Sequence, residues 1–176
     1  MRVSHLRRLY DYNYWANEKL LAVVNTLTPE EFTRSISGSY GSVRNTLVHV
    51  LSAEWGWLDR CGGPPRGPRL SPEKYPTPES VIGTWTEVEQ SMRAFLMTLT
   101  DEDLERGIEF AIGEGPKQML ALGDLLHHAA VHAAHHRGQV ALLVRVLGYA
   151  PGNFDWLFYA NEVRPAPDRG AVASTG

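Results

Sequence analysis

The sequence predicts an all-α protein, a four-helix bundle with short extra helices. Apolar residues recur at spacings of three and four along four long segments, the period of an amphipathic α-helix. Such helices bury their apolar stripes against one another, so four of them favour a bundle. The 176 residues suit one domain, which we expect over 1–162, followed by a disordered tail over 163–176.

The first two long helices are separated by a capped turn. The first amphipathic stripe covers 3–27. Thr28 and Glu31 then form the pattern of a capping box, with proline between them at the first helical position, and this predicts a short helix. The stretch SGSYGS interrupts it, and a second long helix is predicted over 42–60.

A proline- and glycine-rich segment, 61–78, follows, and we expect a long loop there. Loops of this length are often binding elements or mobile segments. A third helix is predicted over 77–99, and 108–119 looks extended, with at most a short strand. The fourth long helix is predicted over 122–147, before Gly148, a residue that favours a left-handed C-terminal cap.

Composition and charge narrow the possible partners. The net charge is −3 and the basic residues are scattered, so we expect no nucleic-acid partner, which would require a basic patch. We expect no membrane span and no signal peptide, because no apolar run is long enough for either. The single cysteine, Cys61, excludes an internal disulfide and favours a reducing, cytoplasmic location. We interpret it as a passive thiol.

Five of the seven histidines fall between His127 and His136. Residues advance about 100° each around an α-helix, so His128, His132 and His136 share one stripe. Neighbours four apart can share a divalent ion, whereas all three span about 12 Å of helix axis, too far for one ion. Two pairs therefore remain open, His128 with His132 and His132 with His136.

A pair of histidines leaves a divalent site incomplete, so another helix has to supply a further ligand. His49 is the candidate, because polar and small residues beside it form a seam on the otherwise apolar second helix. His5 is expected in solvent, and His127 and His135 at the surface or beside the site. The alternative interpretation is a set of hydrogen-bonded core histidines that binds no metal.

Three segments carry a resemblance to a known family. They are YDYNYWANEKLL in the first helix, LVHVLSAEW in the second and HAAHHRGQV in the fourth. With these segments the chain resembles the DinB/YfiT-like family of metalloenzymes, over nearly its whole length to Glu162. The resemblance implies a mononuclear divalent-metal site of three histidines, His49, His132 and His136. His128 is left as a candidate acid or base, a pocket residue or a packing residue.

The motif around His136 also contains Arg137, Gly138 and Gln139. Arg137 lies about 100° from His136 and is expected to point to a neighbouring helix or a subunit interface. We expect Gly138 to permit close helix packing, and Gln139 to hydrogen-bond a ligand or water at the site. The alternative is that Arg-Gly-Gln is only a packing signature.

Three neutral imidazoles leave positions on the ion open to water or substrate, which is typical of catalytic sites. They suit zinc or nickel, with iron or copper as alternatives. The resemblance implies a low-molecular-weight-thiol S-transferase that activates a metal-bound thiolate, a small-molecule substrate and a homodimer. The alternative is a non-enzymatic metal-binding stress-response bundle or small-ligand binder. Glu54 and Asp124 are expected to lie away from the ligands, whereas Asp155 could fold back over the end of the bundle. Since no carboxylate is expected directly beside the ligands, we assign no hydrolase mechanism of the H-E-x-x-H type.

Overall fold

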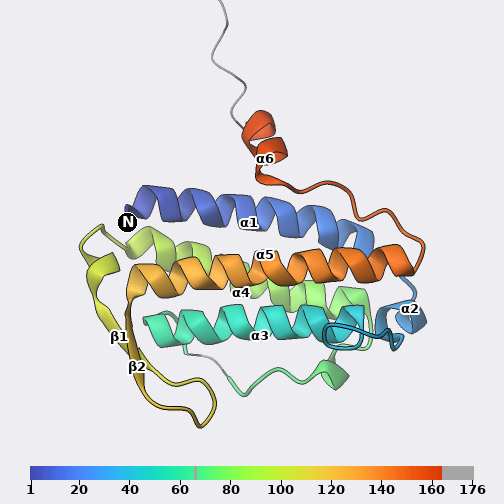
Figure 1. Cartoon of the computed structure of the whole chain (residues 1–176), viewed down its shortest axis with the longest axis horizontal. Helices are drawn as coiled ribbons and strands as arrows, with labels where there is room; N and C mark the ends of the chain where they lie inside the picture. The colour runs from blue at the N-terminus through green and yellow to red at the C-terminus, as the bar shows by residue number, and fades with distance from the viewer. Residues whose placement is uncertain (66, 164–176) are drawn as a thin grey trace, which may run out of the picture.

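Four long helices form the protein in the computed structural model, which describes residues 1–65 and 67–163. They are α1 (Val3–Val24), α3 (Val43–Cys61), α4 (Pro78–Thr98) and α5 (Leu122–Val146). Helices α1 and α3 each pack against both α4 and α5, which closes a four-membered ring (Figure 1). The prediction of an all-α four-helix bundle is confirmed.

Short elements connect and cover the bundle. They are α2 (Pro29–Thr33), the 3-10 helices η1 (Pro72–Lys74) and η2 (Asp103–Glu105), the strands β1 (Gly107–Phe110) and β2 (Gln118–Ala121), and α6 (Trp156–Val163). The strands form an antiparallel hairpin between η2 and α5, so the segment expected to be extended carries two short strands. The predicted disordered tail lies outside the described residues, except for Val163, the last residue of α6.

Local signals in the sequence set the helix ends. The predicted capping box is present, with the Thr28 hydroxyl accepting from the Glu31 amide and the Glu31 carboxylate accepting from the Thr28 amide. Gly62 follows α3 with a φ of +100°, a left-handed conformation that glycine adopts without the steric cost of a Cβ. Helix α1 ends at Val24, three residues earlier than predicted, because Asn25 begins a turn.

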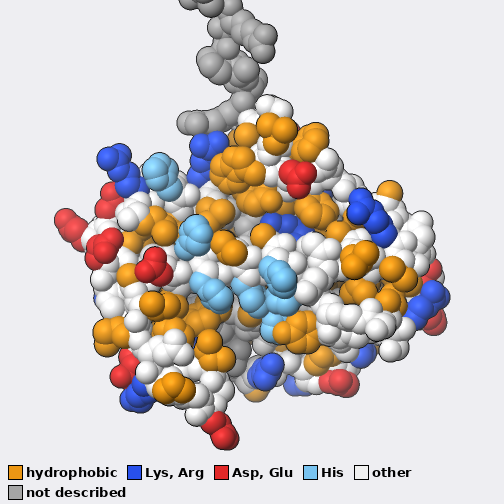
Figure 2. Space-filling model, viewed as in Figure 1, with side chains coloured by type: hydrophobic (Ala, Val, Ile, Leu, Met, Phe, Trp, Pro, Cys, Tyr) orange, Lys and Arg blue, Asp and Glu red, His pale blue; other side chains and the backbone are white. Residues whose placement is uncertain are grey.

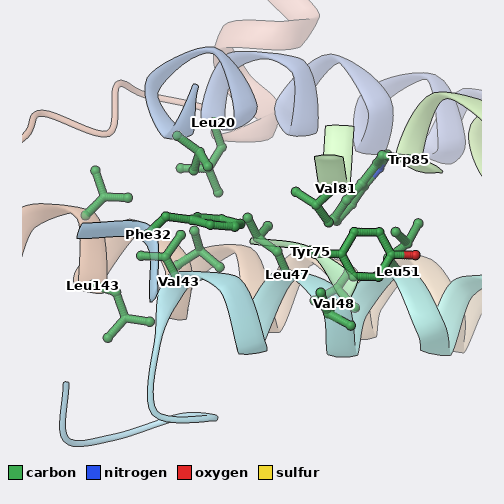
Figure 3. Close-up of a cluster of buried hydrophobic side chains, with 14 of the residues drawn as sticks. Leu20, Phe32, Val43, Leu47, Val48, Leu51, Tyr75, Val81, Trp85 and Leu143 are labelled. Atoms are coloured by element: carbon green, nitrogen blue, oxygen red, sulfur yellow. The ribbon is translucent and has the colours of Figure 1, made fainter. Parts of the chain in front are cut away.

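The core consists of two apolar clusters, one toward each end of the bundle. In one of them Phe32 packs among side chains of all four long helices (Figure 3). The other surrounds Tyr10 and Leu126. Buried polar side chains lie between the two clusters, at the level of Asn17 and Arg137.

The long helices are amphipathic, with a buried apolar stripe and an exposed face that carries charges. Among the described residues, no helix combines the length and the apolar character that a membrane span requires.

Candidate metal centre

Three histidines converge where α3 and α5 lie side by side. His49 comes from α3, and His132 and His136 come from successive turns of α5. One ring nitrogen of each lies within 4.8 Å of the corresponding nitrogens of the other two. Figure 2 shows histidine side chains gathered at the middle of this face. The fold thus brings together the three residues that the family resemblance selected.

The nitrogen positions fit a single divalent ion. Nε2 of His132 lies 3.1 Å from Nε2 of His49 and 3.1 Å from Nε2 of His136. Two imidazole nitrogens bound to one tetrahedral zinc ion are about 3.3 Å apart, because each Zn–N bond is about 2.05 Å long. A neutral imidazole carries one N–H group, so His132 can donate to only one of its two neighbours. A shared cation would satisfy all three lone pairs, and these histidines could therefore hold a metal ion.

The protein environment keeps two of these imidazoles neutral. Burial lowers the pKa of His49 to about 4, and the charges of His136 and Arg69 act in the same direction. Burial also lowers the pKa of His132 to about 4, again with a contribution from His136. Both rings are unprotonated at neutral pH, and the unprotonated ring is the form that binds metals.

Gln139 orients His136. Its side-chain oxygen lies 2.6 Å from Nδ1 of His136, so Nδ1–H donates to the amide and Nε2 faces the cluster. The Ser39 hydroxyl donates to the same oxygen at 2.7 Å, and the Gln139 nitrogen donates to Nε2 of His135 at 3.1 Å. The expected hydrogen bond between Gln139 and a candidate ligand is present, and Gln139 also links His135 to the site.

Arg137 and Gly138 lie outside the site. Arg137 is buried and donates to the side-chain oxygens of Asn13 at 2.8 Å and Asn17 at 2.7 Å, so it points to the neighbouring helix α1. Gly138 is exposed, and a Cβ built there would meet nothing within 4 Å. The expectation that Gly138 permits close helix packing is therefore wrong within this chain, because this side of α5 faces away from the other helices.

Tyr40 is a site residue that the sequence did not reveal. Its hydroxyl lies 3.0 Å from Nε2 of His49, and its ring stacks on the His49 ring with centroids 4.0 Å apart. It belongs to the SGSYGS stretch, whose glycines and serines predict only a break between helices. The available signal was an aromatic hydroxyl in a tight turn directly before the helix that carries His49.

A cleft of about 530 Å³, here called the histidine cleft, opens beside the three histidines. Its walls are α3, α5, the turn of the β-hairpin and Arg69 from the predicted long loop. Its lining comprises His49, Ser52, Ala53, Trp57, Arg60, Arg69, Ala111, Ile112, Gly113, His128 and His132. A second hollow of about 240 Å³, the Tyr40 pocket, also contains His49 and Arg69. No aspartate or glutamate is among the described residues that line either space.

The other histidines and Cys61 lie outside the three-histidine cluster. His128 lines the histidine cleft, and its ring centroid lies 5.9 Å from that of His132 and 5.3 Å from that of Trp57. His5 and His127 are exposed. Cys61 is buried, and burial raises its pKa to about 12, so it stays protonated at neutral pH as expected for a passive thiol.

Glu54 lies on the inner side of α3 and does not line the cleft. The Tyr14 hydroxyl donates to one of its carboxylate oxygens at 2.6 Å, and burial raises the pKa of Glu54 to about 7. This carboxylate is thus turned away from the histidines, as expected from the sequence.

The chain is similar to known proteins over most of its length. A model of the DinB family matches residues 1–168. The protein DinB of Bacillus subtilis is 24% identical over 157 residues, 86% of this chain and 91% of that protein. The uncharacterized protein YrdA of the same organism is 27% identical over 170 residues, 91% of this chain and 95% of that protein.

Solved structures of low sequence identity share the fold. A DinB-like protein from Bacillus cereus has a TM-score of 0.73 at 20% identity, over 86% of this chain and 97% of its own. YfiT from Bacillus subtilis, described as a probable metal-dependent hydrolase with an unusual four-helix bundle topology, has a TM-score of 0.58 at 20% identity, over 82% and 89% of the two chains. Since the family model covers nearly the whole sequence, the chain belongs to the DinB family.

Proposed function

We propose that this protein is a divalent-metal-dependent enzyme that transfers a low-molecular-weight thiol to an electrophile. The observation that carries the proposal is the convergence of three histidine nitrogens beside a cleft that His49 and His132 line and that no described carboxylate lines. A divalent ion held by these nitrogens would lower the pKa of a thiol or water molecule that coordinates it.

The lining favours a thiol over water as the nucleophile. Metal-dependent hydrolases of the H-E-x-x-H type use a glutamate as general base for the attacking water. A thiol that coordinates a divalent metal is acidic enough to lose its proton to an imidazole or to solvent at neutral pH, so it needs no such carboxylate. Glu54, the carboxylate of α3 nearest in sequence to His49, is instead buried against Tyr14.

The proposed reaction balances without a redox partner. The thiol loses its proton, the sulfur forms a bond to the electrophilic carbon, and the leaving group departs with the electron pair of its broken bond.

Residues of the chain have separable roles in this scheme. His49, His132 and His136 would hold the ion, and Tyr40 would donate a hydrogen bond to a group bound beside His49. His128, in the histidine cleft, accepts the thiol proton.

A metal-dependent hydrolase is the second candidate, because YfiT is described as a probable enzyme of this class. In that case water would be the nucleophile, and His128 would be the nearest candidate base. A metal-binding bundle without catalysis is the third possibility.

Turnover by the metal-loaded protein separates these candidates. The assay measures adduct formation between monochlorobimane and glutathione, bacillithiol or mycothiol, together with hydrolysis of simple esters. We expect saturable adduct formation that a chelator and His132→Ala abolish and that the exposed His127→Ala control retains. Ester hydrolysis independent of thiol would favour the hydrolase. Stoichiometric metal with neither activity would overturn the enzyme proposal.

A further inference from the structure

We infer that Arg60 and Arg69 bind carboxylate groups of the reacting thiol, so that the histidine cleft selects an anionic thiol over a neutral or cationic one. This inference rests on the proposed function and assigns its substrate class. Neither arginine belongs to the motifs that carry the family resemblance.

Both arginines belong to the wall of the histidine cleft. Arg60 and Arg69 line the histidine cleft together with His49 and His132. Arg69 also lines the Tyr40 pocket, so it borders both of the spaces that contain His49.

Arg60 lies further along the cleft. Its Nη1 donates to the backbone oxygen of Gly56 at 2.9 Å, and its guanidinium lies over the Trp57 ring, 5.3 Å from the centroid. Gly56 follows His49 by seven residues, about 10 Å along the helix axis. Arg69 therefore lies close to where the thiol sulfur would bind. Arg60 lies further away, at a distance that only a longer thiol would span.

The positive charge of the cleft is not neutralised by the described part of the chain. No ion pair joins Arg60 or Arg69 to any described carboxylate, and no aspartate or glutamate is among the described lining residues. Arg93, by contrast, pairs with both Asp11 and Glu89 on the bundle surface. This local excess occurs in a chain of net charge −3. A cleft lined by one sign of charge concentrates ligands of the opposite sign.

The chemistry of the side chain favours a carboxylate as the ligand. A guanidinium presents its N–H groups as a planar fork that matches the two oxygens of a carboxylate. The contacts of Arg60 with Gly56 and Trp57 hold that fork in place, which reduces the entropy lost when a ligand binds. A thiol with carboxylates at two distances from its sulfur would engage both arginines.

A spectroscopic titration tests the inference without turnover. Cobalt(II)-loaded protein is titrated with 3-mercaptopropanoate, 2-mercaptoethanol and cysteamine, and thiolate-to-cobalt charge-transfer absorption reports binding. We expect the anionic thiol to bind about 3- to 10-fold more tightly than the neutral one, the range of one charge-assisted contact in a solvated cleft, and the cationic thiol to bind least well. Thiol acidity alone predicts the reverse order, because an ammonium group lowers the pKa of a thiol and a carboxylate raises it.

Variants assign the preference to each arginine. We expect Arg69→Gln to remove most of the preference for 3-mercaptopropanoate, and Arg60→Gln to leave it unchanged. For glutathione, which carries two carboxylates, both substitutions should weaken binding, and glutathione diethyl ester should bind the native protein about as weakly as glutathione binds the double variant. Arg145→Gln is the matched control, an exposed arginine of α5 that does not line the cleft.

The outcomes separate this inference from the proposed function. Charge-transfer absorption with all three thiols at equal affinity, or a preference that Arg69→Gln does not change, would overturn the inference and leave metal activation of thiols intact. Stoichiometric cobalt with no such absorption for any thiol would overturn the proposed thiol chemistry, and the inference with it.

Discussion

The side-chain oxygen of Gln139 lies 2.6 Å from Nδ1 of His136, and the Ser39 hydroxyl donates to the same oxygen. His136 is the most buried of the three candidate ligands, with 7% of its surface exposed. A loop residue before α3 and a residue of α5 thus determine together which ring nitrogen of His136 faces the cluster. Partners of this kind commonly affect metal affinity about 10- to 100-fold.

Replacing Gln139 therefore weakens metal binding without removing a ligand. We expect Gln139→Ala to lower zinc affinity about 10- to 100-fold, measured by competition with a chromophoric chelator. Gln139→Glu should retain most of the affinity, because a carboxylate accepts the same Nδ1–H bond. Gln90→Ala, at an exposed position of α4, is the control. Equal affinity of Gln139→Ala and the native protein would show that Gln139 does not support the ligand.

Metal content discriminates between the two histidine pairs on α5. We expect His49→Ala, His132→Ala and His136→Ala each to lose stoichiometric metal in elemental analysis of untagged protein, because two imidazoles remain. His128→Ala should retain it, since His128 lines the cleft outside the cluster. Retention by His136→Ala together with loss by His128→Ala would assign the site to the other pair.

In the proposed reaction, the hydroxyl of Tyr40 should contribute to turnover and not to metal binding. We expect Tyr40→Phe to bind metal with native stoichiometry and to lower kcat about 10-fold, the effect of one hydrogen bond to a reacting group. Tyr149→Phe is the matched control, because its hydroxyl bonds to Glu31 at the surface. A native kcat for Tyr40→Phe would exclude a direct role of the hydroxyl.

We expect Glu54 to make the stability of the fold depend on pH. Burial raises its pKa from 4.5 to about 7, so the folded state holds a proton that the unfolded state releases. The stability that the protonated Glu54 carboxyl contributes is therefore fully present below pH 4.5. It falls as the pH rises above 4.5, and it is lost once the pH has passed 7. The loss should reach about 3 kcal/mol at pH 8. Glu54→Gln cannot ionise at this position. Its free energy of unfolding, measured by urea denaturation, should therefore decrease less between pH 5 and pH 8 than that of the native protein.

The control for this measurement is Glu87→Gln, a substitution of an exposed carboxylate on α4. It should retain the native dependence on pH. If the native protein and Glu54→Gln lose stability in parallel, another group is responsible for the dependence.

Arg137 stabilises the contact between α5 and α1. We expect Arg137→Met to lower the free energy of unfolding by about 3 kcal/mol, because the buried side-chain oxygens of Asn13 and Asn17 lose their partner, at about 1–3 kcal/mol each. Methionine keeps much of the side-chain volume, so the loss reports mainly the hydrogen bonds. Arg145→Met, at the exposed end of α5, should change stability by less than about 0.5 kcal/mol. A loss for Arg137→Met as small as that of Arg145→Met would contradict this role.

The sequence by itself determined the four long helices and most of their ends. Capping between Thr28 and Glu31 and the left-handed turn at Gly62 involve residues a few positions apart, so the chain encodes them locally. The stripe shared by His132 and His136 is local in the same sense. The choice between this pair and His128 with His132 came from family resemblance, and helix periodicity left it open.

Only the tertiary structure decided which distant residues meet. Tyr40 and Arg69 reach the histidines from loops, where no periodicity indicates the direction of a side chain. The expectation for Gly138 was wrong because the face of α5 that other helices cover depends on how the whole chain packs. Local spacing determines which residues share a helix face, whereas the packing of that face against residues far away in the chain determines the site.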